Sequence, residues 1–131
     1  MNIAVGMLHG KNIIVVDDMI ASGDSILDVA EELKKRGANK IFLISTFCFF
    51  TSGIQKFQDA YDKGYFNKIY STDLSYVCED AKYMPWFKQV SCSKYLADII
   101  NTLNSENSIS PLLNGKEHIL NKLKEKHNNQ N

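Results

Sequence analysis

Two neighbouring carboxylates and a short hydroxyl-rich loop stand close together near the start of the chain. Asp17 and Asp18 end an apolar run, and the loop Ser22-Gly23-Asp24-Ser25 follows three residues later. Adjacent carboxylates can accept hydrogen bonds from the vicinal hydroxyls of a sugar, or offer oxygens to Mg²⁺. Serine hydroxyls can donate to a phosphate. The combination is suited to binding a phosphorylated sugar.

The loop is also expected to open a helix, and helix N-termini bind anions. Unpaired backbone N–H groups would point at a phosphate there, at the end of a helix dipole that carries roughly half a positive charge. Gly23 would let the backbone approach the ligand closely. We therefore predict that the sugar hydroxyls bind Asp17 and Asp18, and that the phosphate binds Ala21, Ser22, Gly23, Asp24 and Ser25.

Each of these residues also has a purely structural interpretation. Ser22 could be only the N-cap of the helix, and Asp17 and Asp18 could be a solvated strand end. What favours a ligand site is the direct succession of an apolar strand, twin acids, a glycine-containing hydroxyl loop and an amphipathic helix.

A strand and a helix are expected on either side of the loop. The β-branched run within residues 12–18 does not alternate with polar residues, which predicts a strand covered on both faces and hence a parallel sheet. After the loop, apolar side chains recur at helical spacing, and Gly37 marks the stop. The helical positions are Ile26, Val29, Ala30 and Leu33. In open α/β sheets, the carboxyl end of a strand that leads into a helix is where ligands bind.

The alternation of strands and helices continues along the chain and predicts an α/β fold with a doubly wound, mainly parallel sheet flanked by helices. Residues 73–86 are expected to be an irregular connection. The remaining predictions are strands over 2–7, 40–46, 68–72 and 87–91, a helix lined by Ile54, Phe57 and Tyr61, a helix from Ser93, and a helix after Pro111.

Composition excludes several classes of function. Fifteen basic and fifteen acidic residues give a net charge of zero over 131 residues, so no global field would attract nucleic acid. The apolar stretch 41–50 is about half the roughly 20 residues that a membrane span needs, and no secretory signal opens the chain. We expect a cytoplasmic protein that binds neither nucleic acid nor membrane. Cys48, Cys78 and Cys92 fit neither a disulfide framework nor a zinc motif and are expected to be reduced.

The segment 15–25 resembles the phosphoribosyl-pyrophosphate-binding motif of type I phosphoribosyltransferases. That motif is two hydrophobic residues, Asp-Asp, three variable residues, Thr or Ser, Gly, one variable residue, and Thr or Ser. It is satisfied here by Val15-Val16-Asp17-Asp18, Ser22-Gly23 and Ser25. The flanking segments 27–34, 37–38 and 93–113 resemble, more closely, the C-terminal part of the ribose-phosphate pyrophosphokinase family.

The resemblance covers most of residues 10–114 and implies a domain organisation. Residues 1–114 would be a phosphoribosyltransferase-like domain, the C-terminal half of a two-domain enzyme. Residues 115–131 would be a C-terminal helix followed by a frayed polar tail, which we expect to begin at His127.

The resemblance also implies an activity, the transfer of a diphosphoryl group from ATP to ribose 5-phosphate, which gives phosphoribosyl pyrophosphate and AMP with Mg²⁺ as cofactor. Asp17 and Asp18 would hold the ribose, and the loop from Ala21 to Ser25 would hold the 5-phosphate. The catalytic residues stay unassigned, because the family's basic loop and ATP-binding half are expected upstream of this chain. No residue is assigned as a metal ligand. The chain would be part of a homo-oligomer, would bind ATP only with that half, and would be inactive alone.

Two positions depart from the family pattern, and two other functions stay open. Asp24 stands where the family often has Gly and adds a negative charge beside the phosphate, and Ala21 stands where an acid is common.

One alternative function is that of a non-catalytic, phosphoribosyltransferase-like regulatory subunit. The other is a receiver-type phospho-acceptor domain, in which Asp73 would be phosphorylated beside Asp17 and Asp18.

Overall fold

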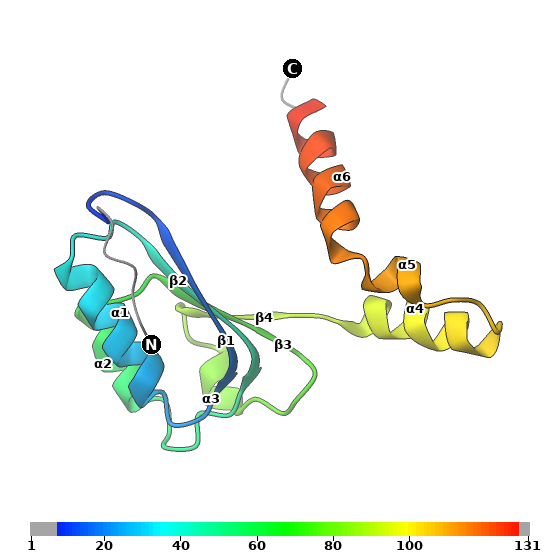
Figure 1. Ribbon diagram of the computed structural model, residues 1–131. Coiled ribbons are helices and arrows are strands. Elements are labelled where there is room, and N and C mark those ends of the chain that lie inside the picture. The colour runs from blue at the N-terminus through cyan, green and yellow to red at the C-terminus, as the bar shows by residue number, and fades with distance from the viewer. Residues whose placement is uncertain (1–7, 129–131) are drawn as a thin grey trace. The chain divides into compact units, whose positions relative to one another are not determined.

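The computed structural model describes residues 8–128, so the strand predicted over 2–7 lies outside the described residues. The chain divides after Cys92 into two compact units, which are described separately (Figure 1).

The first unit is a four-stranded parallel sheet whose order follows the chain, β1-β2-β3-β4. The α/β class with a parallel sheet and flanking helices is therefore confirmed. Its elements are β1 (Ile13–Ile20), α1 (Asp24–Lys35), β2 (Ile41–Cys48), α2 (Gln55–Asp62), β3 (Lys68–Thr72), α3 (Glu79–Lys82) and β4 (Phe87–Val90).

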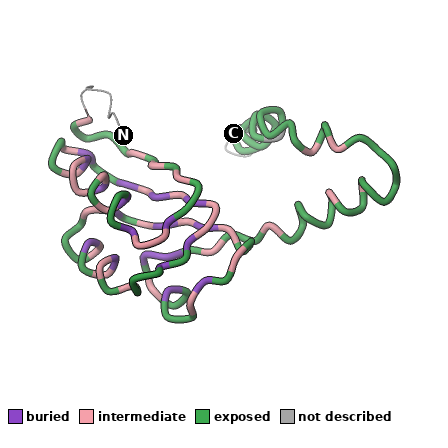
Figure 2. The backbone as a smooth tube through the Cα atoms, turned by 60° about the horizontal axis from the view of Figure 1, so that its bottom comes forward, coloured by how far each residue is buried: buried purple, intermediate pink, exposed green. Residues whose placement is uncertain are grey.

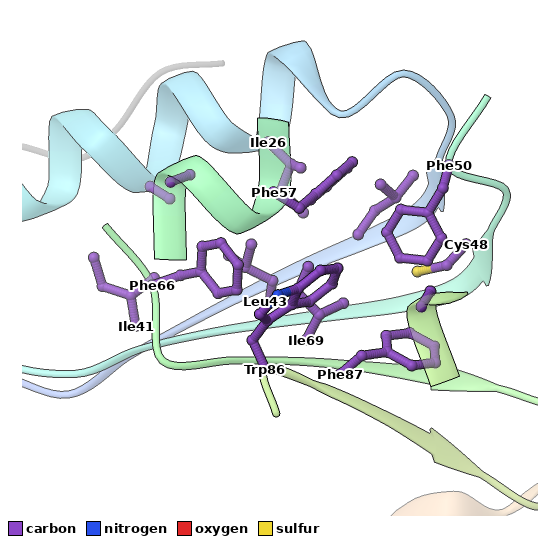
Figure 3. Close-up of a cluster of buried hydrophobic side chains, with 14 of the residues drawn as sticks. Ile26, Ile41, Leu43, Cys48, Phe50, Phe57, Phe66, Ile69, Trp86 and Phe87 are labelled. Atoms are coloured by element: carbon purple, nitrogen blue, oxygen red, sulfur yellow. The ribbon is translucent and has the colours of Figure 1, made fainter. Parts of the chain in front are cut away.

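Helices α1 and α2 lie on one face of this sheet, and the core fills the space between them (Figure 3). The apolar stripe predicted for α1 is confirmed, since Ile26, Ala30 and Leu33 are all buried. They pack with alternate residues of the strands. From the sheet, the core receives Ile41, Leu43 and Ile69. In Figure 2 the buried segments of this unit lie along the strands and on the helices that pack against them.

A cluster of aromatic rings, which includes Phe50 after β2, Phe57 of α2 and Trp86 before β4, fills part of the core. Phe50 meets Phe57 edge-on with ring centroids 4.8 Å apart, and Phe57 stacks on Trp86 at 5.9 Å. The indole N–H of the buried Trp86 donates to Gln58 at 2.8 Å. The irregular connection predicted over 73–86 contains the short helix α3, and it carries Trp86 into the core.

The opposite face of the sheet is exposed at β1, which corrects one expectation. The unbroken apolar run predicted cover on both faces, but the side chains of β1 alternate in burial from Ile13 to Asp18. Ile14 and Val16 are 61% and 73% exposed, whereas Ile13 and Val15 pack against the core.

Strand β1 also runs two residues further than predicted, to Ile20. Asp17 and Asp18 are therefore inside the strand, and Met19 and Ile20 separate them from the loop. Strand β3 matches its predicted range, and β4 ends one residue early, at Val90.

The second unit is helical, and both predicted helices are present. Helix α4 (Ser93–Asn104) is followed by α5 (Ser110–Leu113) and α6 (Gly115–Asn128). The tail expected from His127 is still helical through Asn128. Among the described residues, the helices are too short or too polar to cross a bilayer.

Candidate functional site

The crossover from β1 to α1 carries the predicted phosphate loop at the carboxyl edge of the sheet. All four strands are parallel, so their carboxyl ends meet at this edge. A shallow pocket of about 150 Å³ lies here. The pocket brings Asp17, one of the two acids, together with the whole loop. Its lining residues are Asp17, Met19, Ile20, Ala21, Ser22, Gly23, Asp24, Ser25 and Ile26.

The two acids do not converge on this pocket. Successive residues of a strand point to opposite faces, so half-buried Asp17 lies on the helix side and exposed Asp18 on the open side. The Asp17 carboxylate accepts a hydrogen bond from the backbone N–H of Asp18 at 2.8 Å. Only Asp17 lines the pocket.

Gly23 is the N-cap of α1 and has a left-handed backbone, with φ at +90°. The helix has no side-chain cap, so the interpretation of Ser22 as an N-cap is wrong. A Cβ at position 23 would lie 2.8 Å from Cε1 and Cε2 of Phe57 and closer still to Cζ. Glycine is thus required both by the backbone conformation and by the close packing of α2 against the loop.

The extra negative charge of Asp24 is paired within the structure. Its carboxylate accepts a hydrogen bond from the Ser22 hydroxyl at 2.8 Å and forms an ion pair with Lys56 at 2.6 Å. The hydrogen bond from Lys56, followed by that from Ser22, lowers the pKa of Asp24 below its ordinary value. Lys56 therefore places a cation beside the loop.

Sequence reasoning missed Lys56, because it lies 32 positions after Asp24 and on another helix. The only local signal would have been a lysine in the first turn of α2, which is also what a solvated helix face shows.

A second segment braces the loop from the side of β2. The backbone N–H of Phe49 donates to the carbonyl of Ile20 at 2.8 Å, and that of Thr51 donates to Ala21 at 3.0 Å. Between them, Phe50 has a positive φ of 50° and a buried ring. A left-handed non-glycine residue is held only where its surroundings over-determine it. The aromatic core therefore fixes the backbone beside the loop, a feature the sequence did not reveal.

The described residues offer Mg²⁺ a partial site. They contain no group of three or more His, Cys, Asp or Glu side chains placed to hold a metal ion. Asp17 and Asp18 face opposite ways, and Asp24 is already paired with Lys56. The arrangement fits a Mg²⁺ ion that keeps most of its waters and is held through one carboxylate and the phosphates of a ligand, which is common for this ion.

The position of Asp73 does not favour a phospho-acceptor site. Asp73 follows β3, which is separated from β1 by β2. Its carboxylate accepts a hydrogen bond from the backbone N–H of Cys92 at 2.7 Å, and this bond lowers its pKa. Among the described strands, the order β1-β2-β3-β4 also differs from that of receiver domains, in which the order reverses around the first strand.

The three cysteines are free thiols, as expected. Cys48 is completely buried at the end of β2, and burial raises the pKa of its thiol.

Comparison with known proteins identifies the family of this chain. Residues 1–114 match the family described as the phosphoribosyl synthetase-associated domain. The ribose-phosphate pyrophosphokinase of Mycoplasmopsis pulmonis is 31% identical over 108 residues, which are 82% of this chain and 33% of that protein. The enzyme of the same name from Haemophilus influenzae is 31% identical over 112 residues, covering 84% of this chain and 34% of the relative.

A solved structure agrees at the level of the fold. The crystal structure of phosphoribosylpyrophosphate synthetase from Mycobacterium smegmatis superposes with a TM-score of 0.67 and 24% identity, over 79% of this chain and 33% of that one.

Fold and motif together define a phosphoribosyltransferase-like α/β protein. The chain belongs to the phosphoribosyl synthetase-associated domain family, and it spans about a third of the length of the curated relatives that it matches.

Proposed function

We propose that this chain is the ribose 5-phosphate- and phosphoribosyl pyrophosphate-binding part of a ribose-phosphate pyrophosphokinase. The observation that carries the proposal is the phosphoribosyl motif at the β1–α1 crossover of a chain whose relatives are ribose-phosphate pyrophosphokinases. The reaction would be diphosphoryl transfer from ATP to ribose 5-phosphate.

The 5-phosphate would bind the backbone N–H groups of the loop from Ala21 to Ser25, at the positive end of α1. Lys56 makes this possible despite Asp24, because its ammonium group neutralises the added carboxylate. The Ser25 hydroxyl would donate to the phosphate. The Ser22 hydroxyl already donates to Asp24 and would have to exchange that partner.

The ribose hydroxyls would bind Asp17 and Asp18. Asp17 lines the same pocket as the loop, so it would hold the hydroxyl nearer to the phosphate. Asp18 faces the other side of β1, but β1 is an edge strand. A sugar that reaches around this edge could therefore contact both carboxylates.

Mg²⁺ would supply charge neutralisation on the transferred diphosphoryl group. The residues described here would position the acceptor sugar, which is the part of catalysis that depends on orientation. Binding ATP would require the part of the relatives that this chain does not match. We propose further that the isolated chain is inactive, and that the protein acts in the cytoplasm as a homo-oligomer.

An amide NMR titration of the purified chain with ribose 5-phosphate and Mg²⁺ tests the site, with unphosphorylated ribose as the control. We expect shifts at residues 21–25 only with the phosphorylated sugar. The Asp17→Asn variant should weaken these shifts. Asp28→Asn should not, since it removes the same charge from an exposed position of α1 outside the pocket. Equal shifts with plain ribose, or none, would contradict the proposal.

Turnover is tested separately by incubating the chain with ATP, Mg²⁺ and ribose 5-phosphate. We expect no phosphoribosyl pyrophosphate, and robust product formation would refute the proposed dependence on further residues.

A non-catalytic, phosphoribosyltransferase-like regulatory subunit is the second candidate. It would assemble with a full-length enzyme without binding ribose 5-phosphate itself. Co-assembly together with an unshifted loop in the titration would favour this function.

A further inference from the structure

Helix α6 lies outside the part of the chain that the family accounts for, because the family match ends at residue 114. Each of its side chains whose burial is described is exposed (Figure 2). Three of them are large and apolar: Ile119, Leu120 and Leu123 are 59%, 48% and 58% exposed. Exposed apolar residues that adjoin one another in this way, rather than singly, mark an interaction surface.

The leucines belong to a stripe that runs along α6. Residues three and four apart are neighbours on a helix surface, and this spacing joins Lys116, Leu120, Leu123 and His127. The same alternation of three and four lets two helices pack the side chains of one into the gaps of the other. Leucines fill the two middle positions of the stripe, so it is suited to a short contact with another helix.

Two charges of opposite sign flank the stripe on the same side. Glu117 directly follows Lys116, and Lys124 directly follows Leu123. On one helix these two charges are roughly 10 Å apart along the axis, which is too far for an ion pair. The Glu117 carboxylate accepts a hydrogen bond from the Asn114 amide at 3.2 Å. Because that amide is neutral, the negative charge of Glu117 still attracts a cation.

A second copy of α6 in antiparallel orientation complements both patterns. Leu120 then lies opposite the partner's Leu123, and Glu117 lies opposite the partner's Lys124. Two-fold symmetry repeats each of these contacts, as in most closed dimers. A parallel pair would instead place Lys116 opposite the partner's Lys116, a like-charge arrangement. The charges therefore favour a second copy of this chain in the antiparallel orientation.

We propose that α6 binds the α6 of a second copy of this chain as an antiparallel pair. The leucines of the two stripes leave water together, and two Glu117–Lys124 ion pairs fix the orientation. A contact of this size gives weak association, so the pair forms in a concentration-dependent way. The charges supply specificity more than affinity. This inference does not rest on the proposed function and requires no ligand at the phosphate loop.

Sedimentation equilibrium of the full chain, from micromolar to millimolar concentration, tests the pairing. We expect self-association that Glu117→Lys and Lys124→Glu each weaken at least about tenfold, because each change turns two attractive pairs into two repulsive ones. An equimolar mixture of the two variants should associate again, since every reversed charge then meets an unlike charge on the other chain. A mixture that associates no better than the separate variants would overturn the proposal.

Glu125→Lys and Lys122→Glu are the matched controls, because they make the same changes of charge at positions of α6 away from the stripe. Both should leave the association within about twofold of the wild type, whereas Leu120→Glu should abolish it. Association that Leu120→Glu leaves intact would place the contact on another surface and refute the proposal.

A chain that stays monomeric at every concentration would refute it too. If that monomer sedimented with vesicles containing phosphatidylserine, the occupant of the stripe would be an anionic membrane instead. None of these readouts involves sugar binding, so the proposed function can fail while this interface stands, and the interface can fail while the function stands.

Discussion

Replacing Gly23 by alanine should destabilise the fold through two separable effects. The backbone at this position has φ of +90°, and an L-residue in the left-handed region costs roughly 1–2 kcal/mol. The new methyl would also overlap the ring of Phe57. Overpacking of this kind costs about 1–3 kcal/mol, so we expect a total loss of about 2–5 kcal/mol.

The overlap is costly because Phe57 has nowhere to move. Its side chain is completely buried. It sits between Phe50, edge-on at 4.8 Å, and Trp86, stacked at 5.9 Å. A shift of the ring would disturb both neighbours, one of which holds the backbone that braces the loop.

Gly53→Ala is the matched control. Gly53 also has a positive φ, +77°, but an added Cβ there meets no atom within 4 Å. The variant should lose only the backbone contribution, about 1–2 kcal/mol. The difference between the two variants, about 1–3 kcal/mol, then measures the clash with Phe57.

Urea unfolding followed by tryptophan fluorescence supplies the assay, since Trp86 stacks directly on Phe57. Similar slopes for the wild type and both variants would confirm that the midpoints report stability. Equal losses in Gly23→Ala and Gly53→Ala would refute the reasoning, because they would show that the loop can retreat from Phe57 at no cost.

Three further predictions concern charge and thiol chemistry. Lys56→Met should weaken binding of ribose 5-phosphate a few-fold in the NMR titration, and Asp24→Asn should strengthen it. The control Lys63→Met, near the end of the same helix, should leave the affinity unchanged. The pKa of Asp24 lies below the ordinary 3.8, so its carboxylate should stabilise the fold above that pH and lose this contribution as the pH falls through the folded pKa. A carboxyl NMR titration should give a midpoint below 3.8 for Asp24. Lys56→Met should raise that midpoint. Cys48 should react with a maleimide more slowly than Cys78 and Cys92 at neutral pH, because it is completely buried and burial raises the pKa of its thiol. Equal labelling rates for the three thiols in peptide maps would contradict this prediction.

Local periodicity accounts for the parts of the fold that the sequence predicted well. The helix with Ile26, Ala30 and Leu33 on one side is amphipathic in its own sequence, and it buries that side. The strand over 68–72 is short and bounded by polar residues, so its limits were also readable. In such elements the order of apolar and polar residues along the chain is itself the cause of the secondary structure and of the side that is buried.

The sequence predicts where the candidate site lies in the fold, but much less of how its side chains are arranged. The motif placed the loop correctly after β1, but the extension of that strand to Ile20 puts Asp17 and Asp18 on opposite faces. The roles of Lys56 and Phe57 arise from α2 packing on the loop. Contacts between residues more than thirty positions apart leave no periodic signal, which is why the sequence does not reveal Lys56 as the partner of Asp24.

The failed expectation that β1 is covered on both faces carries information of its own. Strands with one solvated face normally alternate apolar and polar residues, yet the open side of β1 keeps Ile14 and Val16 while its core side keeps Ile13 and Val15. An apolar side chain gains free energy only when it leaves water, so a surface that remained solvated would not require isoleucine and valine there. The sequence is therefore suited to a strand covered on both sides, whereas the described structure covers one.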